Sequence, residues 1–190
     1  MVIPNFPTFI GDGPSGAVFD DSRLYRYTLW RRWVDNCPLE RMCCFIGLNP
    51  STADETADDP TIRRCINFSK SWGFDGYVML NLFAFRATDP VDMYRQTDRV
   101  GKLNDEVLQI VPALMGRTVM AWGAGAVHRK LGADANRCAM VQGWLREYPQ
   151  VYYLRKTKHG HPEHPLYVPG DVVPVLWGCC EINKRMEQSE

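Results

Sequence analysis

The sequence lacks the segments that would attach a protein to a membrane. No run of about 18 apolar residues occurs in its 190 positions, and no basic N-terminal segment precedes an apolar core. An excess of one charge is also missing, because 22 Lys and Arg balance 22 Asp and Glu. This balance argues against non-specific coating of nucleic acid but allows a local basic groove. We expect a cytoplasmic protein with no membrane partner and leave its oligomeric state open.

Cysteine pairs at metal-binding spacing are missing as well. The seven cysteines are an odd number, none of them forms a C-x-x-C pair, and several lie within apolar runs. Cysteines in such runs usually act as small buried hydrophobic side chains. We therefore expect reduced, structural thiols of a cytoplasmic protein.

The sequence does contain a repeated order of apolar strand, turn and helix. Strands are predicted at 42–48, 77–83, 118–122 and 151–155, and helices at 59–73, 97–114 and 135–148. Because these strands are apolar throughout rather than alternating, they favour a parallel sheet that is covered on both faces. We predict an α/β protein: a three-layer αβα domain with a central, mainly parallel four-stranded sheet.

The N-terminal part of the chain follows a different pattern. Residues 1–16 are predicted to be an irregular arm, and residues 23–33 a strand in a hairpin with residues 17–19. With 45% hydrophobic and 12% aromatic residues, a chain of this length suits one folded domain. We expect an α/β core over residues 17–177 and a C-terminal tail over 178–190.

Four turns follow the four predicted apolar strands. In open α/β sheets the ligand binds beyond the carboxyl ends of the strands. The turns at that edge are GLNPS, NLFAFRATDP, WGAGAVHRK and KHGHPEHPLYVP, and they are rich in Gly, Asn, His and Arg. We therefore expect the functional site to be built from these four turns.

Two asparagines in these segments are candidate site residues. Asn49 follows an apolar strand and precedes Pro50, which holds it in an extended conformation. Its amide could orient a water or a substrate oxygen, or the Asn-Pro pair could only shape a turn. Asn81 lies within an apolar strand, where an amide without partners would cost about 1 to 3 kcal/mol. An amide carries a donor and an acceptor in one plane, which suits the edge of a nucleobase.

A histidine-rich loop follows the last predicted strand. His159, His161 and His164 lie close together, but a metal centre would need further ligands from elsewhere in the fold. A histidine in such a loop can instead stabilise negative charge or donate a proton. The basic residues around this loop suit a phosphate backbone, although a solvated surface would look the same. They are Arg155, Lys156 and Lys158.

The loop between the first strand and the first helix is acidic. Its carboxylates are Asp54, Glu55, Asp58 and Asp59. Paired carboxylates can bind magnesium or act as acid and base, whereas Asp58 or Asp59 could cap the helix that follows. We favour the cap, with Arg63 and Arg64 nearby as charge partners or phosphate contacts.

Taken together, the four turns resemble the domain-of-unknown-function family 1643 of bacteria and their phages. The resemblance covers about Arg23 to Pro169, and its most specific part is LNPSTAD followed by DDPTIRRC. More distantly, the same segments in the same order are similar to the uracil-DNA glycosylase superfamily. That second resemblance implies a fold of the uracil-DNA glycosylase type and needs no metal or other cofactor.

The second resemblance also implies roles for individual residues. Gly47, Asn49 and Pro50 match a motif in which Asn49 would position the attacking water. Asn81 would read the pyrimidine edge. A histidine would stabilise the departing base anion; His161 or His164 could be the match, and His161 is preferred.

One position departs from the strict uracil enzymes in a way that bears on specificity. Ser51 stands where those enzymes carry a bulky tyrosine that excludes bases with a 5-substituent. The pocket is therefore expected to accept a larger pyrimidine. An amide at position 49 also cannot accept a proton, which implies slow or specialised chemistry.

We therefore expect a hydrolase that cleaves the N-glycosidic bond of a pyrimidine, 5-modified or mismatched, in DNA or a nucleotide. A base in duplex DNA would have to be flipped out of the stack. Phe68 and Phe83 are candidates for stacking on the base. The candidate phosphate contacts are Arg63, Arg64, Arg86, Arg155, Lys156 and Lys158. The alternatives are a non-catalytic nucleic-acid or nucleotide binding protein, and magnesium-dependent phosphoester chemistry at the acidic loop.

Overall fold

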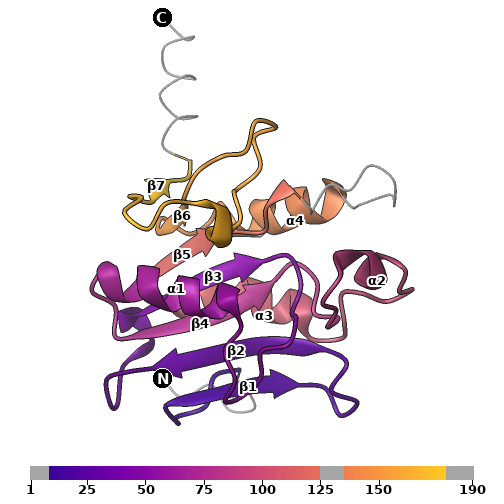
Figure 1. Ribbon diagram of the computed structural model, residues 1–190, viewed down its shortest axis with the longest axis horizontal. Helices are drawn as coiled ribbons and strands as arrows, with labels where there is room; N and C mark the ends of the chain where they lie inside the picture. The colour runs from indigo at the N-terminus through magenta and orange to yellow at the C-terminus, as the bar shows by residue number, and fades with distance from the viewer. Residues whose placement is uncertain (1–8, 125–134, 179–190) are drawn as a thin grey trace, which may run out of the picture.

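A single seven-stranded sheet forms the centre of the molecule (Figure 1). The computed structural model describes residues 9–124 and 135–178. In spatial order the strands are β1-β2-β4-β3-β5-β6-β7. Their bounds are β1 Ser15–Phe19, β2 Arg26–Arg32, β3 Met42–Gly47, β4 Gly76–Asn81, β5 Arg117–Met120, β6 Val151–Tyr153 and β7 Val175–Leu176.

The four apolar strands predicted from the sequence make up the parallel centre of this sheet. β3 pairs in parallel with β4 and with β5, and β5 pairs in parallel with β6. The predicted sheet of four strands is nevertheless too small. The N-terminal hairpin of β1 and β2 continues it through the antiparallel pair β2–β4, and β7 adds an antiparallel strand beside β6. Because β1 begins at Ser15, the last two residues of the predicted arm belong to the sheet.

Four α-helices lie within the described residues: α1 Pro60–Ser71, α2 Pro90–Tyr94, α3 Asn104–Leu114 and α4 Ala135–Leu145. α1 begins as predicted, because the Asp59 carboxylate accepts a hydrogen bond from the Ile62 N–H at 2.8 Å. α3 begins later than predicted. The Asp98 carboxylate accepts hydrogen bonds from the Val100 and Gly101 N–H groups, and this turn delays the helix.

The helices cover both faces of the sheet, as the sequence predicted. Neighbouring residues of a strand point to opposite faces. Phe45 therefore packs with Phe68 of α1, whereas Ile46 belongs to the hydrophobic cluster on the opposite face. That second cluster includes Val107 of α3 and Val141 of α4. The result is a three-layer α/β arrangement.

The five cysteines within the described residues are buried and free, which agrees with the predicted structural thiols. Burial raises the pKa of the Cys43 thiol to about 12, so this group stays protonated at neutral pH. Cys179 and Cys180 lie outside the described residues. In the part of the chain that the structure describes, no helix has the length and apolar character needed to cross a membrane.

Candidate functional site

A cavity of about 770 Å³ lies at the carboxyl ends of the parallel strands, and all four predicted turns contribute to it. The first turn and the residue after it supply Gly47, Leu48, Asn49, Ser51 and Thr52, and the second turn supplies Ala87, Thr88 and Pro90. The third turn supplies Trp122, Gly123 and Ala124. The last turn and the residue before it supply Thr157, Glu163, His164, Leu166 and Tyr167. The start of α1, Met79 and Arg26 complete the lining. A cavity of this size and position is typical of small-molecule sites in α/β proteins. The rest of the third turn lies outside the described residues.

Asn49 lines this cavity with its amide orientation fixed by the backbone. Its Nδ2 donates to the carbonyl oxygen of Ala87 at 2.8 Å and to that of Pro50 at 3.0 Å. The Ala87 N–H in turn donates to the Pro50 carbonyl at 2.9 Å, so the first and second turns are tied together. Because both amide hydrogens are in use, Oδ1 is the polar atom that Asn49 has left for a ligand or a water.

Asn81, at the end of β4, is not among the residues that line the cavity but is buried beside Gly47, which is. Its side chain is 1% exposed, and neither Oδ1 nor Nδ2 has a hydrogen-bond partner among the described residues. Asn81 pairs with Gly47 across the parallel ladder. A Cβ atom on Gly47 would lie 3.0 Å from Asn81 Oδ1 and 2.5 Å from Met79 Cε. The glycine therefore leaves the space that the Asn81 amide and Met79 occupy beside the cavity.

Two buried side chains from helices hold the end of β4 in place. Asn104 Nδ2 donates to the carbonyl oxygens of Asn81 and Leu82, at 3.1 and 3.0 Å. Arg137 Nε donates to the Leu82 carbonyl at 2.8 Å, and its Nη1 lies 2.5 Å from Asp105 Oδ1. The sequence analysis missed both residues, since nothing in their local pattern separates them from ordinary polar helix positions.

His164 is the histidine that lines the cavity. Gly123 makes room for it, because a Cβ atom there would lie 3.2 Å from His164 Cβ, and the Gly123 N–H donates to the Pro162 carbonyl at 2.8 Å. His164 Nδ1 accepts a long hydrogen bond, 3.4 Å, from the Leu166 N–H. Burial lowers the pKa of His164, against the opposing effect of the Asp59 charge. The neutral ring therefore carries its proton on Nε2.

His161, the match preferred on the sequence, is not among the residues that line the cavity. Its backbone instead closes the loop: the carbonyl accepts from the Thr157 N–H at 2.8 Å, and its own N–H donates to Thr157 Oγ1 at 3.2 Å. Of the two histidines that the sequence left open, the structure therefore brings only His164 to the cavity.

The two candidate stacking residues belong to the hydrophobic core rather than to the cavity lining. Phe68 is 2% exposed and stacks on Trp72 with ring centroids 5.4 Å apart. Phe83 is 1% exposed and meets Tyr94 edge to face at 5.9 Å. Phe68 lies within a predicted helix and Phe83 at the end of a predicted strand, and both pack in the hydrophobic core.

None of the six basic residues predicted to contact phosphate lines the cavity. Several are bonded to the protein instead. Arg63 donates to the Asp58 carbonyl, Arg64 to the Val168 carbonyl and Arg86 to the Arg23 carbonyl, while Arg155 pairs with Glu163 and Lys156 lies over the Tyr153 ring. Lys158 is exposed. These six residues therefore lie outside the cavity lining, and their contact with phosphate stays a prediction.

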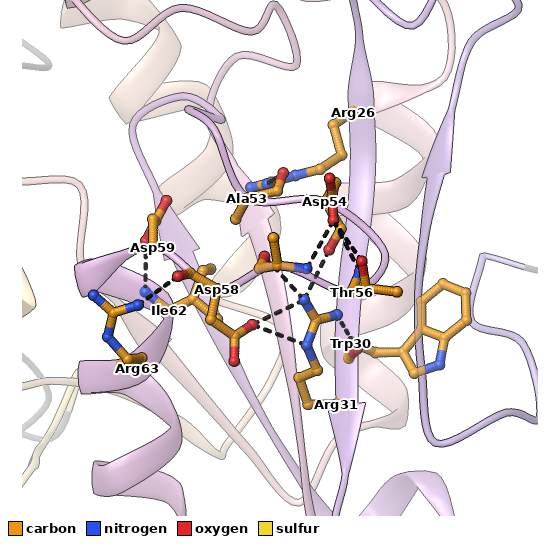
Figure 2. A network of polar contacts seen from close by, with 11 residues as sticks. Arg26, Trp30, Arg31, Ala53, Asp54, Thr56, Asp58, Asp59, Ile62 and Arg63 are labelled. Carbon is orange, nitrogen blue, oxygen red and sulfur yellow. Dashed lines mark hydrogen bonds and ion pairs between the residues drawn. The ribbon is translucent and has the colours of Figure 1, made fainter.

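The acidic loop is fastened to the sheet by arginines from the strand region before it (Figure 2). Arg31 Nη2 lies 2.8 Å from the Asp58 carboxylate and also donates to the Asp54 carbonyl at 2.7 Å. Arg23 holds Glu55 through two hydrogen bonds of 2.8 and 2.9 Å. The predicted charge partners Arg63 and Arg64 do not form these ion pairs.

Each carboxylate of the acidic loop already has a partner in the protein. Asp54 accepts hydrogen bonds from the Thr56 and Ala57 N–H groups, and Asp59 caps α1, as Figure 2 also shows. Glu55 and Asp58 form the ion pairs with Arg23 and Arg31. Within residues 9–124 and 135–178 no three His, Cys, Asp or Glu side chains are grouped as metal ligands. These contacts weigh against the magnesium alternative.

Arg26 is a cavity residue that the sequence analysis missed, since no candidate site residue was expected in the predicted strand at 23–33. It lines the cavity but is only 2% exposed. Its Nη1 donates to the Ala53 carbonyl at 2.7 Å, and its Nε has no partner among the described residues. Burial lowers the pKa of Arg26 to about 10, so the guanidinium stays charged at neutral pH. The strand carries three arginines, and nothing in the local sequence distinguishes Arg26 from the other two.

Comparison with known proteins identifies a family but no function. The model of the family described as Protein of unknown function (DUF1643) matches residues 26–166. That range contains the parallel strands and nearly all of the residues that line the cavity. No curated protein and no solved structure matches the chain. Because the match covers more than half of its length, the chain belongs to the DUF1643 family.

Proposed function

We propose that this protein is a nucleobase-processing enzyme that hydrolyses the N-glycosidic bond of a pyrimidine, 5-modified or mismatched, in DNA or a nucleotide. The observation that carries the proposal is the Asn81 amide, buried without a partner beside Gly47 of the cavity lining. Leaving both polar atoms of a buried amide unpaired is unfavourable, and such groups in native proteins usually serve a ligand or a bound water. The paired donor and acceptor of an amide fit the edge of a pyrimidine.

The cavity also supplies groups for the reaction itself. Water would add to the anomeric carbon of the sugar, the bond from that carbon to the base nitrogen would break, and the bonding electrons would leave with the base. The proton lost by the water would pass to the departing base anion or to solvent. Asn49 Oδ1 would accept a hydrogen bond from the attacking water and orient it. His164 Nε2–H would donate to an oxygen of the departing base and stabilise its negative charge.

The distant resemblance to the uracil-DNA glycosylase superfamily supports the same assignment. Gly47 and Asn49 come from the first turn and His164 from the last, and all three line one cavity. Asn81 pairs with Gly47 across the parallel ladder. The order of these segments along the chain is that of the superfamily.

One observation favours a second candidate, a non-catalytic protein that binds the same nucleotide or nucleic acid. The Asn49 amide can hold a water but cannot accept its proton. An enzyme with this group would be slow unless another base takes the proton. A binding protein would need the cavity and the Asn81 amide but no proton acceptor.

The test is release of free base from a panel of duplexes and nucleotides that carry modified pyrimidines. The wild type should release base from at least one substrate, and Asn49→Ala and His164→Ala should each lower the rate at least about tenfold. His161→Ala is the matched control, because it removes a nearby histidine outside the cavity lining. Tight binding of a panel member without release of free base would favour the second candidate, a non-catalytic binding protein, over the enzyme.

The same panel tests the magnesium alternative. Cleavage of a phosphoester bond that requires magnesium, is lost in Asp58→Ala and Asp59→Ala and persists in Asn49→Ala, without release of free base, would contradict the hydrolysis of an N-glycosidic bond. We expect the opposite pattern, with no loss of base release on addition of a chelator.

A further inference from the structure

Arg26 differs from the other arginines that hold the acidic loop. Arg31 pairs with the Asp58 carboxylate and donates to several carbonyl groups, and Arg23 is paired with Glu55. Arg26 lies between them in sequence and reaches the same loop, yet its side chain has one hydrogen bond, to the Ala53 carbonyl, and no carboxylate within ion-pair distance among the described residues. It is also the one of the three that lines the cavity.

A buried charge without a counter-ion needs a reason. Buried guanidinium groups in proteins are nearly always paired, because burial removes their hydration. Arg31, with a side chain 10% exposed, meets this requirement through Asp58. Arg26, which is 2% exposed, has its Nε unpartnered and faces a cavity large enough for a ligand. An anionic group in the cavity would supply the missing counter-ion.

The other charged residues of the cavity do not take this role. Glu163 is paired with Arg155 outside the lining, at 2.5 Å. Asp59 is close enough for its charge to favour the charged form of Arg26, but no ion pair joins the two among the described residues, and its Oδ1 caps α1, where the positive end of the helix dipole lies against its charge. Among the described lining residues, Arg26 is the only Lys or Arg. The site thus offers one cation, deep within the cavity, rather than a row of cations along a surface.

We propose that Arg26 binds the phosphate of a single pyrimidine nucleotide, so that the substrate is a nucleoside monophosphate rather than a DNA strand. This inference rests on the proposed function and narrows its substrate. A DNA backbone is usually held by several exposed Lys and Arg side chains. The six candidates for that role lie outside the cavity lining, whereas a guanidinium buried in the cavity matches one terminal phosphate.

The experiment measures binding by calorimetry of four probes: a pyrimidine nucleoside, its 5′-monophosphate, inorganic phosphate and a single-stranded oligonucleotide that contains the same base. The wild type should bind the monophosphate about tenfold to a hundredfold more tightly than the nucleoside. Arg26→Gln should bind the two equally. Arg64→Gln, which removes a basic residue outside the cavity lining, should keep the wild-type ratio.

Arg26→Lys keeps the positive charge and guards against a variant that fails to fold. It should bind the monophosphate less tightly than the wild type, because lysine lacks the planar pair of donors, and still prefer it to the nucleoside. The ratio of monophosphate affinity to nucleoside affinity in the wild type is measured without any variant. Equal binding of nucleoside and monophosphate by the wild type would overturn the inference and leave the proposed function standing.

Two other results separate the inference from the proposed function. Arg26-dependent binding of inorganic phosphate, without binding of any nucleoside or nucleotide, would support an anion site and refute the nucleotide substrate. Tighter binding of the oligonucleotide than of the monophosphate, unchanged in Arg26→Gln, would overturn the inference in favour of a polymer substrate.

Discussion

Gly47 of β3 and Asn81 of β4 are partners in the parallel ladder, and the missing side chain of the first leaves space for the amide of the second. A methyl group at position 47 would lie 3.0 Å from Asn81 Oδ1. The sheet therefore carries, at its carboxyl edge, a polar group that is buried without a partner. A buried polar group without a partner lowers the stability of the protein unless a ligand bonds to it. A mutation that removes this group can therefore raise stability while it weakens binding.

We predict that Asn81→Leu raises the free energy of unfolding by about 1 kcal/mol while it abolishes binding of the pyrimidine ligand. Leucine is close to asparagine in size and removes two unpaired polar atoms from the interior. Urea denaturation gives the stability, and calorimetry gives the binding. Loss of stability together with retained binding would contradict a role for Asn81 in reading the base.

Asn104→Leu is the matched control for this prediction. Its amide nitrogen donates to the carbonyl oxygens of Asn81 and Leu82 at the same strand end. The substitution leaves two buried carbonyl groups without these donors, so stability should fall by about 1 to 3 kcal/mol. A higher free energy of unfolding in Asn81→Leu and a lower one in Asn104→Leu would show that the Asn81 effect is specific.

The ion pair between Arg31 and Asp58 should be the main fastening of the acidic loop. Asp58→Asn leaves the Arg31 charge, whose side chain is 10% exposed, with only carbonyl partners. We expect a loss of about 1 to 3 kcal/mol in the free energy of unfolding by urea denaturation. Glu55→Gln removes the partner of the exposed Arg23 and should have a smaller effect. An equal or larger loss in Glu55→Gln would contradict this ranking.

His164 should make the fold less stable in mild acid. Burial lowers its pKa below the usual value of 6.5, and the charge of Asp59 opposes the shift. The unfolded chain therefore binds a proton at higher pH than the folded protein does. The contribution of the neutral ring to stability is present above pH 6.5 and is lost as the pH falls through the lowered pKa.

Urea denaturation at several pH values between 7 and 5 tests this contribution. His164→Gln should lose less stability across this range than the wild type does, because glutamine does not titrate. Parallel curves for the two proteins would show that the ring is not held in its neutral form by the fold.

The strands at the centre of the sheet were predictable because their signal is local. Continuous apolar runs such as residues 42–48 can be recognised without knowing their neighbours, and four turns that follow such strands must meet at one edge. The extension of the sheet through β2 was not predictable. The pairing of β2 with β4 joins segments far apart in sequence and depends on which edge of the sheet is left open.

The candidate site was predictable only in part, for related reasons. Asn81 stood out because it is a polar residue within an apolar strand, and Asn49 because it directly follows one. The choice between His161 and His164 depended on the close approach of Gly123, a contact between distant turns. Arg26 was missed because a loop distant in sequence buries it. Arg31, an arginine on the same strand, only holds that loop through its ion pair with Asp58, and the local sequence does not tell the two apart.

Ser51 should set the size of the base that the cavity accepts. It lines the cavity close to Asn49, and under the proposed function it takes the place of a tyrosine that the strict uracil enzymes carry. We predict that the wild type binds deoxyuridine monophosphate and its 5-methyl analogue with similar affinity. Ser51→Tyr would place a ring in the space for the 5-substituent, and overpacking of this kind costs about 1 to 3 kcal/mol. The 5-methyl analogue should therefore lose about tenfold to a hundredfold in affinity relative to deoxyuridine monophosphate.

Ser51→Ala, which adds no volume, should leave the ratio of the two affinities unchanged. If Ser51→Tyr weakens both nucleotides equally, the tyrosine only obstructs the cavity, and position 51 does not sense the 5-substituent.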